Sequence, residues 1–162
     1  MTDDVVTLIA SRADFDVAVR SAFAHAAECD AGEICIVDPN FNDWPLNERA
    51  VVESLAHWAS SRKKLIVFAK NFDEMARRHS RFVEWRRQWA HIAQCRTDDD
   101  LEGDSLPTLL FVPGIVSVRL LDRVRYRGTA SAKPVDLVES RETIDALLQR
   151  STEAFPATML GL

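Results

Sequence analysis

Short, wholly apolar runs alternate along this chain with longer stretches in which apolar residues recur every three or four positions. The short runs predict buried strands, and the longer stretches predict amphipathic helices. A strand, helix, strand order in the first half implies parallel strands joined by right-handed crossovers. The predicted strands cover 5–10, 33–37, 65–69, 92–96, 108–112, 115–121 and 124–127, and the predicted helices cover 13–28, a stretch opening at Pro45, 72–90 and 138–152. We therefore predict an α/β protein with a mixed β-sheet flanked by helices, in which 108–121 forms a hairpin.

The junction after the strand at 33–37 is the first candidate site. The apolar run stops at Asp38-Pro39, a polar loop follows, and Pro45 suits the first turn of a helix. Ligands of α/β proteins bind at the carboxyl ends of strands, where such loops lie. The candidate ligand-binding residues of this loop are Asp38, Asn40, Asp43 and Trp44.

The predicted helix at 72–90 contributes two more candidates. His79 and Arg86 are seven residues apart and fall in the middle of its apolar stripe. A charged side chain there needs a partner or a route to water. Arg86 either extends past Trp85 and Trp89 to solvent, or reaches a carboxylate or a ligand anion at the sheet edge.

Hydrolysis and metal binding are the two chemistries to consider for these candidates. Asp38, His79 and Arg86 are the candidate catalytic residues of a hydrolase, provided that they converge with Asp43 in one pocket. Their spacing matches no metal-ligand motif, so no metal is predicted, and capping of helix starts is the other use for Asp43 and Asp73.

Composition places the chain in the globular class, and 162 residues predict one domain over 1–162. The formal net charge of −5 disfavours a dedicated nucleic-acid binder. Arginines nevertheless gather in 77–97 and 119–133, on either side of an acidic loop at 98–104. They either pair with that loop, or form patches that attract an anionic ligand, a nucleic acid stacked on Trp85 and Trp89, or a protein partner.

Other function classes receive no support from the sequence. The acidic start lacks the features of a signal peptide, and no apolar run approaches the ~20 residues that cross a bilayer. The three cysteines form no C-x-x-C pair, which favours a reduced, cytoplasmic protein without membrane contact. Glycine-rich phosphate loops are missing, so no cofactor is predicted.

The order of elements resembles one half of a phospholipase D-like domain, and more closely the small bacterial domains of unknown function with that fold. The resemblance rests on Ile36-Val-Asp-Pro39, the arginine-rich helix containing His79, the hairpin at 110–122, Tyr126-Arg-Gly128 and the tail at 157–162. It covers nearly the whole chain. Because phospholipase D-like halves usually pack in pairs, the resemblance implies a homodimer.

The catalytic motif of that family is missing. Phospholipase D enzymes carry His-x-Lys and a following Asp, of which the His attacks the phosphodiester and the Lys holds the phosphate. None of the four histidines here is followed two residues later by Lys, and the aligned positions are Leu106, Thr108 and Pro113. The resemblance thus implies a catalytically silent binding or interaction module, whose lost catalytic positions lie on the hairpin and apart from the Asp38 loop.

Overall fold

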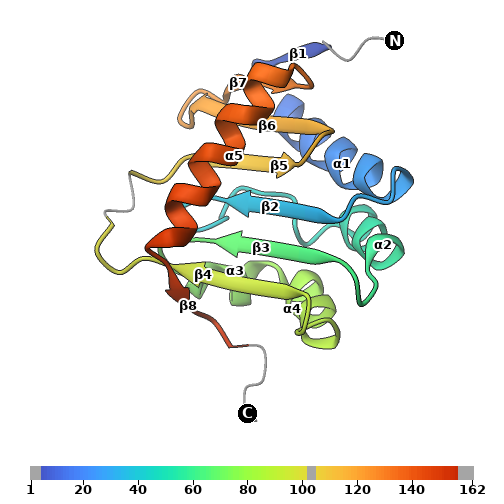
Figure 1. The fold of residues 1–162 in the computed structure, drawn as a ribbon, viewed down its shortest axis with the longest axis vertical. Helices are drawn as coiled ribbons and strands as arrows, with labels where there is room; N and C mark the ends of the chain where they lie inside the picture. Colours follow the sequence, from blue (N-terminus) through green and yellow to red (C-terminus); the bar gives the residue numbers. More distant parts are fainter. Residues whose placement is uncertain (1–4, 102–104, 157–162) are drawn as a thin grey trace.

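A computed structural model describes residues 5–101 and 105–156, which form one eight-stranded mixed sheet with helices on both faces (Figure 1). The strand order is β1-β7-β6-β5-β2-β3-β4-β8. This architecture confirms the predicted fold class. The strands are β1 (Val6–Ile9), β2 (Glu33–Val37), β3 (Lys64–Phe68), β4 (Ala93–Thr97), β5 (Thr108–Val112), β6 (Val116–Asp122), β7 (Arg127–Ser131) and β8 (Thr152–Glu153).

The three central strands run parallel, and all the other pairings are antiparallel. β2, β3 and β4 are joined by helical crossovers, as their apolar runs predicted. β5 pairs antiparallel with β2, placing Leu109 opposite Val37, and the hairpin of β5 and β6 carries the sheet outward from there. This pairing decides the site, because it sets the start of β5 beside the end of β2.

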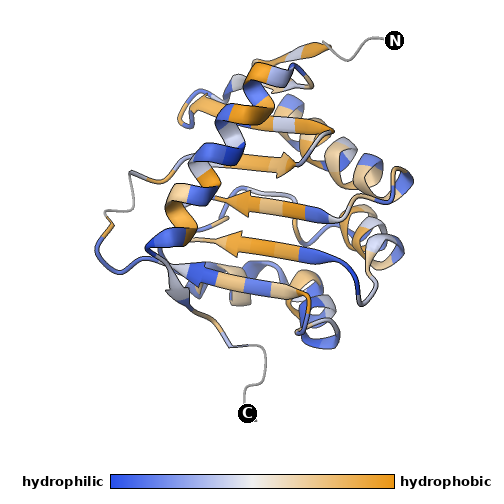
Figure 2. Cartoon of the chain, in the orientation of Figure 1, coloured by the Kyte–Doolittle hydropathy of each residue, from blue (hydrophilic) through white to orange (hydrophobic). Residues whose placement is uncertain are grey.

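Two hydrophobic cores lie on opposite faces of the sheet. Four helices cover one face: α1 (Arg12–Glu28), α2 (Arg49–Trp58), α3 (Asp73–Arg78) and α4 (Ser80–Gln88). α5 (Pro134–Gln149) crosses the other face alone, where Ile144 and Leu147 pack against Cys35 and Phe111. Figure 2 shows the central strands as the most hydrophobic part of the chain. Within the described ranges, no helix has the length and apolar character needed to cross a bilayer.

Several predicted boundaries were wrong for identifiable reasons. Pro45 does not open a helix, since α2 begins only at Arg49, after Glu48, whose carboxylate is held by Arg20 at 2.9 Å. The helix predicted at 72–90 is split at His79 into α3 and α4. At the split, the amide N–H of Arg81 donates to the side chain of Asn47 at 2.9 Å.

Smaller corrections concern the last third of the chain. Of the residues predicted as a strand at 124–127, 124–126 form a turn and Arg127 begins β7, and α5 starts four residues earlier than predicted. β8 was not predicted. Near the C-terminus, the ring of Phe155 stacks on Phe72 at 5.4 Å between centroids, and the tail at 157–162 that entered the family resemblance lies outside the described residues.

Candidate functional site

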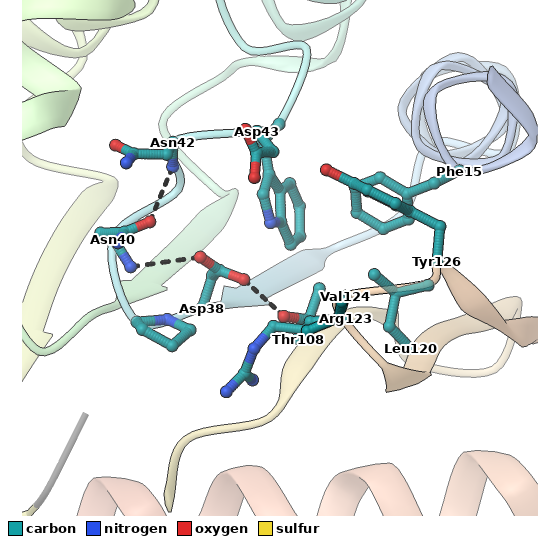
Figure 3. A pocket seen from close by; sticks show the side chains of 12 residues that line it. Phe15, Asp38, Asn40, Asn42, Asp43, Thr108, Leu120, Arg123, Val124 and Tyr126 are labelled. Atoms are coloured by element: carbon teal, nitrogen blue, oxygen red, sulfur yellow. Dashed lines mark hydrogen bonds between the residues drawn. The ribbon is translucent and has the colours of Figure 1, made fainter. Parts of the chain in front are cut away.

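A cavity of about 400 Å³ lies where the end of β2 meets the start of β5 and the turn between β6 and β7 (Figure 3). Four of the six predicted ligand-binding residues line it, because the loop after β2 forms one wall. The lining residues are Phe15, Asp38, Pro39, Asn40, Asn42, Asp43, Trp44, Thr108, Leu120, Arg123, Val124 and Tyr126.

Asp38 organises this wall. One carboxylate oxygen accepts the backbone N–H groups of Asn40 and Phe41, at 3.1 and 2.8 Å, and so fixes the loop. The other oxygen accepts the hydroxyl of Thr108 at 2.5 Å. The side chain is buried, and these three donors satisfy it without a charged partner. Asp38 therefore ties the loop after β2 to the beginning of β5.

This bond corrects the sequence interpretation of the hairpin. Leu106 and Thr108, which the family resemblance aligns with His-x-Lys, were expected to lie apart from the Asp38 loop. The structure places Thr108 directly against Asp38, with Leu106 two residues before it. Leu106 is 1% exposed in the core beneath α5, and Thr108 is 2% exposed. Pro113 lies at the far end of β5, in the hairpin turn.

The opposite wall comes from the turn between β6 and β7. Arg123 donates from Nη1 to the carbonyl oxygen of Leu106 at 2.6 Å. The hydroxyl of Tyr126 points toward the side of the cavity that Asp43 occupies (Figure 3). Burial, followed by the negative charge of Asp43, raises the pKa of Tyr126 above its usual value. The neutral phenol therefore persists to higher pH.

Aromatic rings close the floor of the cavity. The ring of Phe15 meets Trp44 edge-on at 5.4 Å between centroids, and Trp44 is itself buried. Among the described residues, the indole N–H of Trp44 has no hydrogen-bond partner. A buried donor without a partner is costly, so an acceptor from a ligand that reached this nitrogen would be favoured.

His79 does not reach the cavity. Its side chain is buried, as its place in the apolar stripe predicted, and Nε2 lies 2.7 Å from the carbonyl oxygen of Phe41. That oxygen only accepts, so Nε2 carries the proton, and Nδ1 has no partner among the residues that the structure describes. Burial lowers the pKa of His79. His79 thus supports the backbone of the loop whose other side Asp38 fixes.

Arg86 lies elsewhere again: it is buried rather than extended to solvent, and none of the described carboxylates pairs with it. Its guanidinium donates to the carbonyl oxygens of Ala93, at 3.2 Å, and of Phe155, and lies over the Phe155 ring at 5.2 Å. It therefore joins α4 to β4 and the C-terminal segment. The convergence of Asp38, Asp43, His79 and Arg86 that a hydrolytic site requires is not present.

Eight of the twelve lining residues were not predicted as site residues, among them three polar residues distant in sequence. Thr108, Arg123 and Tyr126 lie 70 or more positions after Asp38, and they reach it only through the antiparallel pairing of β5 with β2. In the sequence, Tyr126 was part of the family resemblance and Arg123 part of the 119–133 arginine patch. Across the described ranges, no group of three or more His, Cys, Asp and Glu side chains is arranged to hold a metal ion.

The two arginine patches differ in the structure. On α3 and α4, Arg77 and Arg78 pair with Glu74, and Arg87 pairs with Glu84. Trp85 is buried, so it cannot act as a stacking platform. Beside the cavity, Arg125 and Arg127 are exposed, and neither forms an ion pair with any residue that the structure describes.

Comparison with known proteins supports the fold through structure alone. No protein-family model matches the sequence, and no curated protein matches it significantly. TrmBL2, an archaeal chromatin protein whose structure shows a novel mode of DNA binding, has a TM-score of 0.64 and 10% identity over 92% of this chain. The chain spans about half of TrmBL2, 54% of its length.

Two bacterial structures share the same arrangement. NucT from Helicobacter pylori has a TM-score of 0.62 and 8% identity, covering 93% of this chain and 99% of NucT. Phosphatidylserine synthase from Haemophilus influenzae has a TM-score of 0.52 and 13% identity, covering 97% of this chain and 40% of that enzyme. At such low identity these likenesses establish the fold, which is that of a single phospholipase D-like half, and nothing further.

Proposed function

We propose that this chain is one non-catalytic phospholipase D-like domain that binds a ligand in the cavity between Asp38 and Arg123. The observation that carries the proposal is the hydrogen bond between Thr108 and Asp38. Thr108 is at a position that the family resemblance aligns with the catalytic motif. Its hydrogen bond to Asp38 joins the loop after β2 to the start of β5.

Hydrolysis by the family's route needs a nucleophilic histidine and a phosphate-holding lysine. Leu106 has no nucleophilic atom and is packed in the core beneath α5. The Thr108 hydroxyl already donates to a carboxylate. The one buried histidine of the neighbouring helices, His79, is occupied by the carbonyl oxygen of Phe41. These roles are structural, which supports a binding function over a catalytic one.

The free donors of the cavity favour a small anionic group, a phosphate or a carboxylate. The indole N–H of Trp44 has no partner in the described part of the chain, and only Nη1 of Arg123 has an acceptor there. Asp38 and Asp43 oppose the negative charge of such a ligand. We therefore expect weak binding, with a dissociation constant on the order of 1 mM for inorganic phosphate.

Hydrolysis of bis-p-nitrophenyl phosphate tests the catalytic part of the proposal. The wild-type protein is expected to release p-nitrophenol at the rate of the protein-free blank, with or without added divalent cations. Turnover above the blank that the Asp38→Asn substitution removes would overturn the assignment, because contamination would not respond to that change.

Binding is tested separately by following the indole N–H signal of Trp44 in ¹H–¹⁵N spectra while inorganic phosphate or acetate is added. The signal is identified from its loss in Trp44→Phe. We expect it to shift in wild type and in Arg125→Ala, which alters a neighbouring arginine outside the cavity, and to stay fixed in Arg123→Ala. A signal that both anions leave unmoved contradicts anion binding and leaves the catalytic conclusion intact.

A second candidate function is nucleic-acid binding through the turn between β6 and β7. Arg125 and Arg127 project there without ion-pair partners among the described residues, next to the partly free Arg123. The DNA binding stated for TrmBL2 supports this candidate only by analogy of fold. We also propose that the domain acts as a homodimer, a proposal that the usual pairing of phospholipase D-like halves supports.

A further inference from the structure

A groove of about 570 Å³ lies between α2 and α4, and none of the residues that line it lines the cavity at Asp38. Figure 1 shows the two helices as neighbours on one face of the sheet. Because β2, β3 and β4 are parallel, the helices in the two crossovers between them run in the same direction. Their first turns meet where the amide N–H and the guanidinium of Arg81 both donate to Asn47, just before α2.

The floor of the groove is apolar. Val52 and Ala56 on α2 line it together with Trp85 on α4, and the exposed Ala56 leaves it open because its side chain ends at Cβ. Trp85 is 4% exposed, and its indole N–H has no acceptor among the described residues. A partner that brought an acceptor to this nitrogen would therefore gain a hydrogen bond that the described chain does not supply.

One end of the groove is positively charged. Arg49 and Arg81 lie in the first turns of α2 and α4, where the helix dipole already places partial positive charge. Neither first turn contains an acidic residue, and no described carboxylate forms an ion pair with either arginine. The acids that line the groove, Glu53 and Glu84, lie one turn further along. The arginines thus present two unneutralised charges to a carboxylate from outside the chain.

We propose that this groove binds an amphipathic helix of another protein, with its apolar stripe on the floor and a carboxylate beside Arg49 and Arg81. The side-chain ridges of a helix pack between two neighbouring helices, which is a common way to recognise a helical segment. Arg49 and Ala56 are two turns apart, so the groove is ~10 Å long and accepts side chains from two or three turns. Because both rims are exposed, a small molecule would be covered on one side only, whereas a helix covers the floor and both rims.

Fluorescence anisotropy of a labelled peptide tests the proposal on the full chain. The acidic probe is a capped helical peptide of about 15 residues with leucines at helical spacing and glutamates in its first turn, and the basic probe has lysines in place of those glutamates. We expect the acidic probe to bind with a dissociation constant of about 10–50 µM and the basic probe at least about 10-fold more weakly. A net charge of −5 attracts the basic probe at long range, so a preference for the acidic probe reports the local arginines.

Substitutions of exposed residues locate the binding surface. Ala56→Gln places a longer polar side chain on the floor, and Ala50→Gln is its matched control, because Ala50 is also exposed on α2 but does not line the groove. Arg49→Ala removes one of the two charges, and its control is Arg77→Ala on α3, whose arginine is paired with a glutamate. We expect Ala56→Gln and Arg49→Ala each to weaken binding of the acidic probe at least about 5-fold, and both controls to bind it like wild type.

The indole N–H signal of Trp85 in ¹H–¹⁵N spectra, identified by its loss in Trp85→Phe, gives a second readout and is expected to shift when the acidic probe binds. An acidic probe that fails to bind at about 1 mM, or that binds and leaves this signal unmoved, overturns the proposal. So does equal binding of the two probes, or an equal effect of Ala56→Gln and Ala50→Gln. A Trp85 signal that moves with protein concentration alone assigns the groove to a second copy of this chain, which also overturns the proposal.

Discussion

Asp38 and Thr108 line the candidate cavity, and both are used here to hold the chain together. Thr108→Val removes the hydroxyl, keeps the shape, and leaves a buried carboxylate oxygen without its donor. We expect a loss of about 1–2 kcal/mol in the free energy of unfolding, measured in urea. Thr129→Val on β7 is the control, because Thr129 makes no side-chain hydrogen bond with the described residues. Equal effects of the two substitutions would contradict the structural role of Thr108.

The buried imidazole of His79 predicts a pH dependence of stability. Because burial lowers the pKa of His79, its ordinary value of 6.5 applies only to the unfolded chain. Above that pH both states are neutral at this residue. Below it, the unfolded chain takes up a proton that the folded chain resists, so the free energy of unfolding falls as the pH drops.

We expect urea unfolding at pH 5.5 and 7.5 to show this loss in wild type, and His79→Gln to reduce it. The glutamine amide keeps a donor for the carbonyl oxygen of Phe41 and does not titrate. An identical difference between the two pH values in wild type and variant would assign the loss to other groups.

The burial of single residues was predictable here, but their partners were not. The apolar stripe placed His79 and Arg86 on the inward face of the predicted helix, and both are buried. It could not show that both donate to backbone carbonyl oxygens. Local periodicity does not indicate where the distant loop at Phe41 and the segment at Phe155 lie in the fold. A buried polar side chain thus predicts that a partner exists, and tertiary structure decides which one.

The packing of β7 against β6 requires a glycine at position 128. Gly128 lies beside a bulge in β6, and a Cβ added there would overlap the carbonyl oxygen of Arg119 and lie 2.8 Å from the Cα of Leu120. Gly128→Ala is expected to cost more than about 3 kcal/mol in urea unfolding, because backbone atoms must move. At Gly32 nothing lies within 4 Å of the added Cβ, so Gly32→Ala is expected to stay within about 1 kcal/mol of wild type.

Helix and strand identities followed from periodicity, whereas their ends depended on distant residues. The strand predicted at 33–37 matches β2 at both ends, since an apolar run of four residues, preceded by Gly32-Glu33 and followed by Asp38, leaves little choice. The helix predicted at 72–90 failed at one residue, where Asn47 takes the amide N–H of Arg81 from outside the helix. Local pattern has no access to such a partner, 34 positions away.

Across the whole molecule, the candidate site could be predicted on one side only. The loop after β2 was recognisable in the sequence as polar residues that follow a buried strand. It supplies Asp38, Asn40, Asp43 and Trp44 to the cavity. The facing wall follows from the pairing of β5 with β2, which the apolar pattern of a hairpin does not specify. For a site between the parallel and antiparallel parts of a mixed sheet, the sequence therefore predicts the residues of one wall and not those of the other.

The balance of charge over the molecule gives a last prediction, which separates the two candidate functions. A net charge of −5 repels nucleic acid at long range. Any binding must therefore depend on a few exposed arginines that acids do not neutralise, and Arg125 and Arg127 are of that kind in the described part of the chain.

If single-stranded DNA binds, the logarithm of its affinity should fall linearly with the logarithm of salt concentration, and the Arg125→Ala/Arg127→Ala double variant should lower that slope by about 1–2. Arg77→Ala/Arg87→Ala is the matched control, because both of these arginines are already paired with glutamates and their loss should change the slope by less than about 0.5. Fluorescence anisotropy of a labelled oligonucleotide measures both slopes. Binding that is absent at about 20 mM salt, or that falls equally in the two double variants, removes nucleic acid from consideration and leaves the cavity as the functional site.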